Sequence, residues 1–232
     1  MAVPPPTEGV DRALVVMAKA PRPGNVKTRL AAAFSPAEAA ALSIALLTDT
    51  IRLAITVPGV RVGLMCQRGE TPLVQLAVRD GVAIVEQLGG GLAAALASTF
   101  EQFLSAGYRR VVAFNSDSPQ VSGDALRDAF AALETADLTV GPTDDGGYYL
   151  VGAKAVHAGL FEAPRLGTSG ALDALTERAT ELGLRVARCA PAFDVDLPAD
   201  VTRLARELEA SPERAPATAA LLAGWRRTRR LP

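Results

Sequence analysis

The sequence predicts an α/β fold in which a mostly parallel β-sheet is covered by helices on both faces. Apolar runs of strand length alternate along the chain with longer helical stretches, and this alternation is typical of parallel sheets. Acidic turns also follow three of the apolar runs, as expected at the carboxyl ends of strands in an open sheet. With 232 residues and 49% hydrophobic content, the chain can bury a sizeable core as one domain.

Each expected strand is a short apolar run whose length suits a strand better than a helix. In chain order these runs are residues 13–18, 61–65, 82–85, 110–114, 138–140, 148–152 and 185–189.

The expected helices have recognisable start or stop signals. Ser35-Pro36-Ala37-Glu38 is a capping box with proline at the first helical position, and Gly107 is a natural C-terminal cap. The helices are expected at residues 36–55, from near 72, and at 92–106, 124–133, 169–182, 199–208 and 215–227.

We expect a single domain over residues 12–225, with a disordered arm at 1–11 and a basic tail at 226–232. The arm is Pro-rich and polar where a signal peptide would need a basic start and an apolar stretch. Polar residues interrupt the apolar stretch at 39–55, so no membrane span is expected. These features predict a cytoplasmic protein, and they leave homo-oligomer formation open.

The composition argues against several classes of function. A net charge of -1 gives no general attraction to nucleic acid. His157 is the only histidine, so a histidine-dependent triad or a His-rich metal site is not expected. Cys66 and Cys189 lie outside any C-x-x-C pair, which favours reduced thiols over a disulfide or a structural zinc site.

Three acid-bearing turns are the main functional signal. They are Asn115-Ser116-Asp117-Ser118-Pro119, Thr143-Asp144-Asp145-Gly146-Gly147 and Asp194-Val195-Asp196-Leu197-Pro198. Acids at the carboxyl ends of strands converge on one site. Two carboxylates about 4 Å apart repel by roughly 4 kcal/mol at an effective dielectric near 20, so a divalent ion bridging to a substrate phosphate is favoured there.

A basic loop follows the first expected strand, at residues 19–30. Its prolines and Gly24 fix a loop that can wrap a ligand, and its cations suit phosphate. The spacing of a Walker loop is absent, and a solvated turn is the alternative. The side chains expected at a nucleotide phosphate are Lys19, Lys27, Thr28 and Arg29, together with Ser116 from the first acidic turn.

Four runs, at residues 19–30, 116–119, 141–152 and 194–200, occur in an order that resembles the bacterial rSAM/selenodomain-associated transferases. The chain is more distantly similar to the 2-phospholactate guanylyltransferases, which share a K-T-R-L loop and a late D-x-D-x-P-x-D motif. The likeness covers about residues 14–204. It implies a Rossmann-like nucleotide-diphospho-sugar transferase fold of the glycosyltransferase-A type, with the nucleotide at the N-terminal half of the sheet and the acceptor at the C-terminal half.

The resemblance also implies a site for Mg²⁺ or Mn²⁺. By position, Asp117 and Asp196 bind the ion between the nucleotide phosphates, and Asp194 supports them. The residues alone leave alternatives open, because Asp117 can form a turn and Asp196 can cap the helix that starts at Pro198.

The run at 144–149 suits an acceptor. Asp145, together with Asp144, is expected to position an acceptor hydroxyl or to act as the base. The residues expected to bind the acceptor are Gly146, Gly147, Tyr148 and Thr168. A D-G hairpin turn with tyrosines packed on the sheet is the alternative. At Leu166-Gly167-Thr168 the chain departs from the family, which has an aromatic residue there, and Thr168 can instead cap the next helix.

The leading hypothesis is metal-dependent transfer of a sugar from a nucleoside-diphosphate sugar to a small-molecule acceptor. A second hypothesis is nucleotidyl transfer from a nucleoside triphosphate to a phosphorylated small acid, with release of pyrophosphate. A third is a catalytically silent nucleotide-binding protein. Fold similarity does not separate these three.

Overall fold

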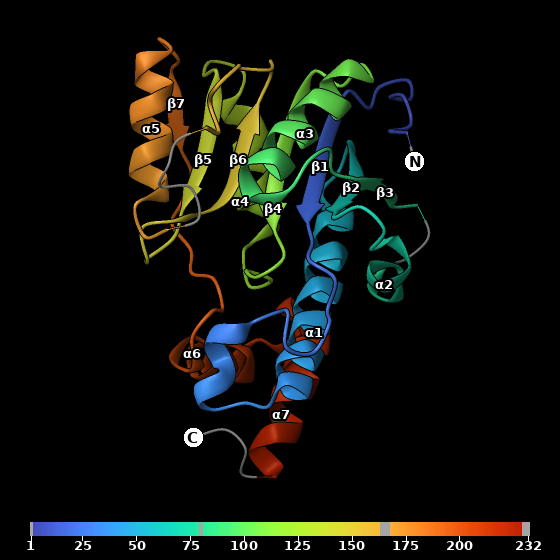
Figure 1. The fold of residues 1–232 in the computed structure, drawn as a ribbon, viewed down its shortest axis with the longest axis vertical. Coiled ribbons are helices and arrows are strands. Elements are labelled where there is room, and N and C mark those ends of the chain that lie inside the picture. Colours follow the sequence, from blue (N-terminus) through green and yellow to red (C-terminus); the bar gives the residue numbers. More distant parts are fainter. Residues whose placement is uncertain (1, 79–80, 163–167, 229–232) are drawn as a thin grey trace.

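The computed structural model of the protein describes residues 2–78, 81–162 and 168–228. Within these residues, the strands form one sheet with the order β3-β2-β1-β4-β6-β5-β7 (Figure 1). The strands are β1 Arg12–Met17, β2 Val60–Cys66, β3 Ala83–Glu86, β4 Arg110–Asn115, β5 Leu138–Pro142, β6 Tyr148–Ala153 and β7 Val186–Arg188. The predicted α/β fold with a mostly parallel sheet is confirmed.

Strand β6 runs antiparallel to both of its neighbours, β4 and β5, whereas the other paired strands are parallel. Residues 143–147 join β5 to β6, and a connection this short joins only antiparallel strands. The start of β6 therefore lies at the same edge of the sheet as the carboxyl ends of β1, β4 and β5. This edge is where the acidic turns lie.

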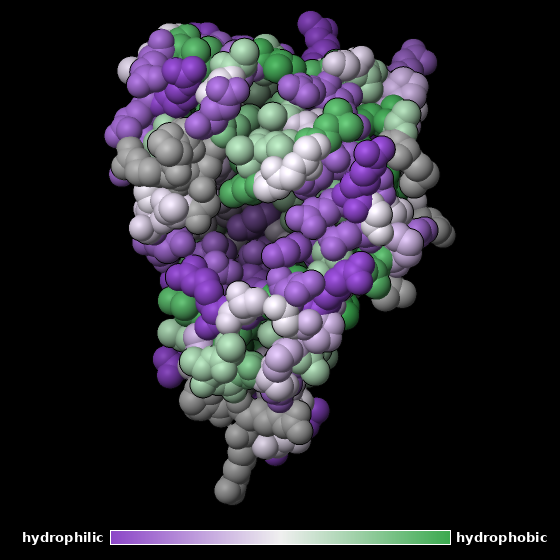
Figure 2. Space-filling view, in the orientation of Figure 1, coloured by the Kyte–Doolittle hydropathy of each residue, from purple (hydrophilic) through white to green (hydrophobic). Residues whose placement is uncertain are grey.

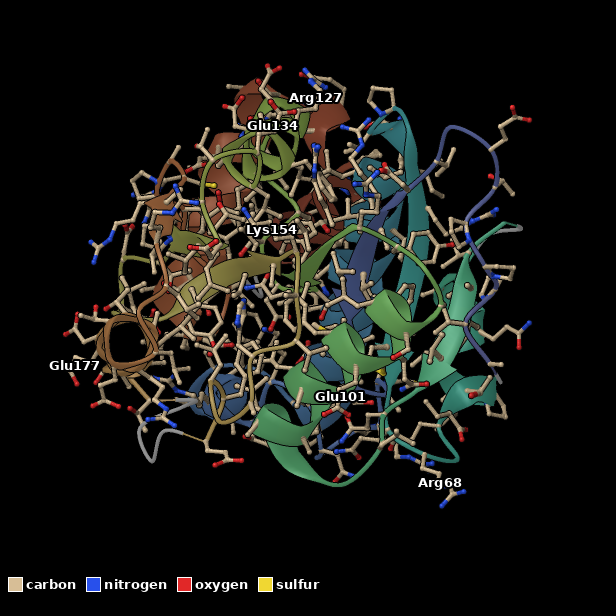
Figure 3. The ribbon with its side chains drawn as sticks, turned by 90° about the horizontal axis from the view of Figure 1, so that it is seen from above. Arg68, Glu101, Arg127, Glu134, Lys154 and Glu177 are labelled. Atoms are coloured by element: carbon tan, nitrogen blue, oxygen red, sulfur yellow. The ribbon has the colours of Figure 1, made fainter. Side chains whose placement is uncertain are left out.

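Helices cover both faces of the sheet. They are α1 Pro36–Thr56, α2 Thr71–Val74, α3 Gly91–Ser105, α4 Gly123–Ala132, α5 Ala171–Glu181, α6 Pro198–Ala210 and α7 Pro216–Arg227, with 3-10 turns η1 Thr28–Ala32, η2 Gln75–Ala77 and η3 Pro212–Arg214. α1 and α4 pack on one face, and α3 and α5 pack on the other. Seen from above, α3 with Glu101 and α4 with Arg127 lie on opposite sides of the sheet (Figure 3).

The central strand β1 is buried on both faces. Leu14 and Val16 join the hydrophobic cluster under α1 and α4, whereas Ala13 and Val15 join the cluster under α3 and α5. This alternation follows from the two-residue period of a strand. Cys66 is buried in the first of these clusters, and both cysteines are free thiols.

A third cluster lies beyond the carboxyl edge of the sheet and joins η1, α6 and α7 to the first half of α1 (Figure 1). Phe34 stacks on Trp225 there, with ring centroids 5.0 Å apart. The buried residues of the third cluster are Leu30, Phe34, Leu42, Leu46, Phe193, Val195, Val201, Leu204, Ala205, Leu208, Ala215, Leu222 and Trp225. The loop after β1 is therefore packed against the C-terminal helices.

Asp49 ties α1 to the start of α7. Its side chain is buried and accepts hydrogen bonds from the backbone N–H groups of Ala217, at 3.1 Å, and Thr218, at 2.7 Å. The first N–H groups of a helix have no partner within that helix, and the N-cap residue Ala215 has no side chain that can accept. Asp49 therefore caps α7 from a neighbouring helix.

Helix α1 has the length and apolar composition of a membrane span, although no span is expected from the sequence. At 21 residues and a mean hydropathy of 1.5 it is long and apolar enough to cross a membrane, because a window average tolerates the polar residues that interrupt it. More than half of that window, 56%, is buried inside the protein, and it includes Asp49. The helix thus packs as a core helix of the α/β fold.

The N-terminal arm and the basic tail both contact the domain. The Tyr108 hydroxyl donates to the Pro4 carbonyl oxygen at 3.1 Å, so the arm lies against the end of α3. In the tail, Arg226 forms an ion pair with Glu209 of α6. Residues 229–232 of the predicted tail lie outside the described residues.

Candidate functional site

The loop between β1 and α1 is shaped by two residues with positive φ. Gly24 has a φ of 83°, which glycine adopts without strain. Lys27 has a φ of 50°, which is uncommon for a residue with a side chain. Lys27 directly precedes η1, whose Leu30 is buried in the third cluster. The anchored turn therefore fixes the direction of the Lys27 side chain.

Lys27 contacts two of the predicted metal ligands. Its side chain is only 5% exposed, and its Nζ lies 2.7 Å from Asp117 Oδ1 and 3.0 Å from Asp196 Oδ1. Arg29 Nη1 lies 3.2 Å from Asp196 Oδ2, and the Arg29 side chain stays exposed. The basic loop and the acidic turns thus form one cluster of charged side chains.

The carboxylates of Asp117 and Asp196 do not form the local turn or the helix cap that the sequence left open as alternatives. Asn115 Oδ1, and not Asp117, makes the turn after β4, because it accepts the N–H of Asp117 at 3.2 Å. The start of α6 is capped by Asp200, whose Oδ2 accepts the N–H of Asp196 at 3.1 Å. The turn and cap alternatives therefore do not account for the Asp117 and Asp196 side chains.

Residues 190–196 bring the three acidic turns together, because this segment runs along the strand ends. Ala192 N–H donates to the Pro142 carbonyl oxygen at 3.0 Å, beside the end of β5. Val195 N–H donates to the Asp117 carbonyl oxygen at 3.1 Å, beside the end of β4. Asp194 and Asp196 are thus set next to the other two turns.

The pKa values reflect an excess of acid in this cluster. Burial lowers the pKa of Lys27, but Asp117 and Asp196 raise it by more, so the ammonium stays charged. Burial raises the pKa of Asp196, but Lys27 and Arg29 lower it by more. Burial, followed by the charges of Asp196, Asp145 and Asp117, raises the pKa of Asp194 to about 7. The surroundings of Asp194 therefore favour a further positive charge.

The two acids of the turn at 143–147 have different surroundings. Asp145 Oδ1 accepts from Thr143 Oγ1, at 2.6 Å, and from Gly147 N–H, at 3.0 Å. No described residue donates to Asp145 Oδ2. Asp144 Oδ2 instead accepts from Arg203 Nη1 of α6 at 2.7 Å. Each acid keeps one oxygen without a donor among the described residues, but of the two only Asp145 lines the larger cavity described below.

The backbone conformation and close surroundings at position 146 require glycine. Its φ is 86°, and a Cβ atom there would lie 1.9 Å from the carbonyl oxygen of Ser169. Thr168 Oγ1 accepts the N–H of Gly170 at 3.2 Å, just before α5. Leu166 and Gly167, the other residues of the family departure, lie outside the described residues.

Two cavities meet at Arg29 and Asp196, which line both. The larger, about 630 Å³, is also lined by Asp145, Gly147, Tyr148, Thr168 and Asp194. The smaller, about 210 Å³, is also lined by Lys19, Lys27, Thr28 and Ser116. The surface is hollowed near the middle of the molecule, between the sheet and the helices beyond its edge, and hydrophilic residues line much of the opening (Figure 2).

Most predicted site residues are thus placed at these two cavities. Gly24 shapes the loop next to Asn25, which lines the smaller cavity. The sequence analysis missed Met17 and Asn115, the last residues of β1 and β4, which are register partners in the sheet and line the larger cavity. Their position at the carboxyl ends of strands could have identified Met17 and Asn115 as cavity-lining residues. It also missed Leu92 and Leu96 of α3, whose spacing is indistinguishable from that of core positions.

The glycines at 89–91 lead into α3. The Gln87 side chain donates to the Gly89 carbonyl oxygen at 2.9 Å, and Gly90 is the N-cap residue of the helix. Leu92, in the first turn of α3, then lines the larger cavity. The glycines therefore form the turn that sets α3 beside that cavity.

The carboxylates of Asp117 and Asp196 are suited to a divalent ion because they lie close enough together to share one cation. Asp117 and Asp196 converge on one ammonium, so one cation can contact both carboxylates, and carboxylate oxygen is the ligand that Mg²⁺ and Mn²⁺ prefer. Over the described part of the chain, no group of three or more His, Cys, Asp or Glu residues is arranged to hold an ion. Further ligands would have to come from substrate phosphate or water, and the ion would have to take the place of Lys27 Nζ.

A protein-family model matches about half of this chain. Residues 50–168 match the model of a family described as "Uncharacterized protein conserved in bacteria (DUF2064)". Among curated proteins, no sequence matches this chain significantly.

Several solved structures share this fold. A Desulfovibrio desulfuricans G20 protein provisionally named a nucleotide-diphospho-sugar transferase is 25% identical, with 93% of this chain and 95% of that chain covered and a TM-score of 0.84. CMP:2-keto-3-deoxy-manno-octonic acid synthetase, complexed with CTP, is 14% identical, with 86% and 98% covered and a TM-score of 0.56. A nucleotidyl transferase from Methanothermobacter thermautotroptrophicus is 16% identical, with the same coverages and TM-score. At these lower identities the likeness shows the fold alone.

Proposed function

The chain belongs to the DUF2064 family of uncharacterized bacterial proteins, and we propose that it transfers a sugar from a nucleoside-diphosphate sugar to a small-molecule acceptor. The resemblance to nucleotide-diphospho-sugar transferases supports a nucleotide donor. The proposed compartment is the cytoplasm.

One observation carries this proposal: the Lys27 ammonium lies between Asp117 and Asp196, at the place where the two cavities meet. A buried lysine ammonium that is paired with two carboxylates can exchange them for the phosphate of a bound donor. The proposed exchange is that Lys27 turns from the carboxylates to a phosphate of the donor, together with exposed Arg29. The smaller cavity, with Lys19, Thr28 and Ser116, would then hold the phosphates.

A divalent ion is part of the proposal. Asp117 and Asp196 would hold Mg²⁺ or Mn²⁺ once Lys27 has moved, and Asp194 would support them. The chemistry that a bound ion supplies is stabilisation of the negative charge that develops on the leaving diphosphate. Lys27 and Arg29 would contribute to the same stabilisation.

The acceptor is proposed to lie in the larger cavity, with Asp145 as the base. Asp145 Oδ1 is held by Thr143 and Gly147, so the carboxylate has a fixed orientation, and Oδ2 would be the oxygen that meets the acceptor. Oδ2 would take the proton of the acceptor hydroxyl while the acceptor oxygen bonds to the anomeric carbon of the donor sugar. The bond from that carbon to the diphosphate would break, and the nucleoside diphosphate would leave at Lys27.

Nucleotidyl transfer is the second candidate. The small basic cavity favours it, because a triphosphate carries more negative charge than a diphosphate and three cationic side chains line that cavity. Here a phosphorylated acceptor would attack the α-phosphorus, and pyrophosphate would leave. A silent nucleotide-binding protein is the third candidate, and it predicts binding without turnover.

Product analysis separates the candidates. The protein is incubated with Mg²⁺ or Mn²⁺ and with panels of nucleoside-diphosphate sugars or nucleoside triphosphates, plus mixed small acceptors, and products are resolved by anion-exchange chromatography. Release of nucleoside diphosphate from a nucleotide sugar supports the leading proposal. Release of pyrophosphate without turnover of any nucleotide sugar would promote the second. The control is Asp117→Ala, which should reduce the metal dependence of nucleotide binding at least about tenfold, or roughly 1.4 kcal/mol.

A further inference from the structure

The hydroxyl of Tyr148 is a buried polar group without a hydrogen-bond partner among the described residues. Tyr148 is the first residue of β6, and its side chain lines the larger cavity. Buried polar groups in folded proteins nearly always have a partner, so an orphaned one at a cavity wall calls for an explanation. A ligand in the cavity is the partner that the position allows.

An irregularity in the sheet directs Tyr148 to this cavity. The pairing of β5 and β6 shifts register so that Gly141 lies opposite Leu150 and Pro142 opposite Tyr148. Tyr149 is left as the extra residue, and it packs with Leu150 in the cluster under α1 and α4. Tyr148 is thereby switched to the opposite face, where it packs against the cluster under α3 and α5.

The wall around the Tyr148 ring is largely apolar. The apolar side chains that line the cavity from α3 and from the sheet on this face are Met17, Leu92, Leu96, Ala113 and Val151, and Asn115 of β4 lies beside Met17 on the same face. The charged side chains that line the cavity, Asp145, Asp194, Asp196 and Arg29, come instead from the loops beyond the strand ends. The cavity therefore has a largely apolar wall with two polar side chains, Tyr148 and Asn115, and a charged wall where the chemistry is proposed.

We propose that the acceptor is a small molecule with an apolar body and few polar groups, one of which pairs with the Tyr148 hydroxyl. This inference rests on the proposed function, because it places the acceptor in the larger cavity beside Asp145. The acceptor hydroxyl that reacts meets the charged wall, and the apolar body lies against α3. Tyr148 is thus a residue that determines acceptor specificity.

A polyhydroxylated sugar fits this wall poorly. Each sugar hydroxyl that leaves water needs a new hydrogen-bond partner, and a hydroxyl left without one carries its full desolvation cost. The wall offers two such partners, in Tyr148 and Asn115. An apolar ring or chain gains from the same burial, so the cavity discriminates between the two kinds of acceptor.

Cyclohexanol and myo-inositol are matched probes, because both are six-membered carbon rings and they differ in the number of hydroxyl groups. Each is titrated onto the full-length protein and its binding is followed by saturation-transfer NMR. Cyclohexanol should bind at least about tenfold more tightly than myo-inositol. Tyr148→Phe should weaken cyclohexanol binding several-fold, because it removes the hydroxyl and keeps the ring.

Two further variants locate the binding. Leu92→Glu places a charge on the apolar wall at a residue that is 48% exposed, so the fold tolerates it, and cyclohexanol binding should be lost. Tyr108→Phe is the control, since its hydroxyl binds Pro4 far from the cavity, and it should bind both probes as the wild type does.

Equal or tighter binding of myo-inositol, no binding of either probe, or no effect of Tyr148→Phe would overturn the inference. Nucleotide binding is measured on the same samples. If nucleotide binds normally and cyclohexanol fails, only the acceptor class is rejected. If cyclohexanol binds through Tyr148 but no nucleotide or nucleotide sugar binds, the apolar subsite stands and the proposed function is rejected.

Discussion

Lys27 Nζ lies 2.7 Å from Asp117 Oδ1, so the basic loop after the first strand is tied directly to the acidic turn after β4. The ammonium is almost fully buried, and Asp196 contacts it from the other side. A buried ion pair contributes little net stability, but removing one partner leaves uncompensated charge. The arrangement is therefore better suited to exchange of cations than to structural reinforcement.

Replacement of Lys27 should make the ligand-free protein a better metal binder. In Lys27→Met the two carboxylates lose their cation, so we expect at least about tenfold tighter Mn²⁺ binding without nucleotide, or roughly 1.4 kcal/mol. We also expect a lower Tm that Mn²⁺ restores. Calorimetric titration and thermal denaturation measure the two effects.

Lys19→Met is the matched control for this experiment, because Lys19 lines the same small cavity but forms no ion pair with either acid. It should bind Mn²⁺ as the wild type does. Equal Mn²⁺ affinity in wild type and Lys27→Met would show that the carboxylates do not form a metal site.

Asp145→Asn should impair turnover and leave the donor site intact. The asparagine oxygen can still accept from Thr143 and Gly147, so the turn is kept while the charge and the base are lost. Donor affinity should stay within about threefold, and turnover should fall on the order of a hundredfold or more. Asp144→Asn is the control. It weakens only the exposed pair with Arg203, so turnover should change little. A larger loss of turnover in Asp144→Asn than in Asp145→Asn would reverse the two assignments.

Gly146→Ala and Gly24→Ala should differ sharply in stability. Both glycines have positive φ, which costs alanine roughly 1–2 kcal/mol. At Gly146 the new methyl group would also collide with the Ser169 carbonyl oxygen, whereas nothing lies within 4 Å at Gly24. Urea denaturation should therefore show a loss of about 1–2 kcal/mol at Gly24 and a clearly larger loss at Gly146. Similar losses would mean that the segment before α5 moves aside at little cost.

Asp49 should stabilise the packing of the C-terminal helices. Asp49→Ala leaves one buried and one partly buried N–H group of α7 without partners, so the free energy of unfolding should fall by roughly 2–3 kcal/mol. Asp49→Asn keeps one acceptor oxygen and should lose less. Denaturation curves of the two variants measure the difference. An unchanged stability in Asp49→Ala would mean that water caps α7 equally well.

The sequence predicted the elements of the fold better than their arrangement. The capping box at Ser35 and the apolar alternation are local signals, and the structure has the corresponding helix and strands where they indicate. The short connection at 143–147 is a local signal for the antiparallel pairing of β6 with β5, but the pairing of β6 with β4 joins distant segments, which a local pattern does not encode. The link between Lys27 and Asp196, separated by 169 positions, likewise depends on packing in the third cluster. Residue types identified the candidate site, but only the fold could reveal which side chains neutralise one another there.

The stack of Phe34 on Trp225 has a consequence for shortened versions of the protein. A chain that stops before α7 would keep every residue that lines the two cavities, yet it would lose half of this stack and the partner groups of Asp49. Phe34, which follows the turn at Thr28–Ala32, would then lose its aromatic partner, while the turn itself would keep its contacts with α1 and α6. Although the last helix supplies no side chain to either cavity, we expect its removal to loosen the cluster that supports the loop of Lys27 and so to weaken the site indirectly.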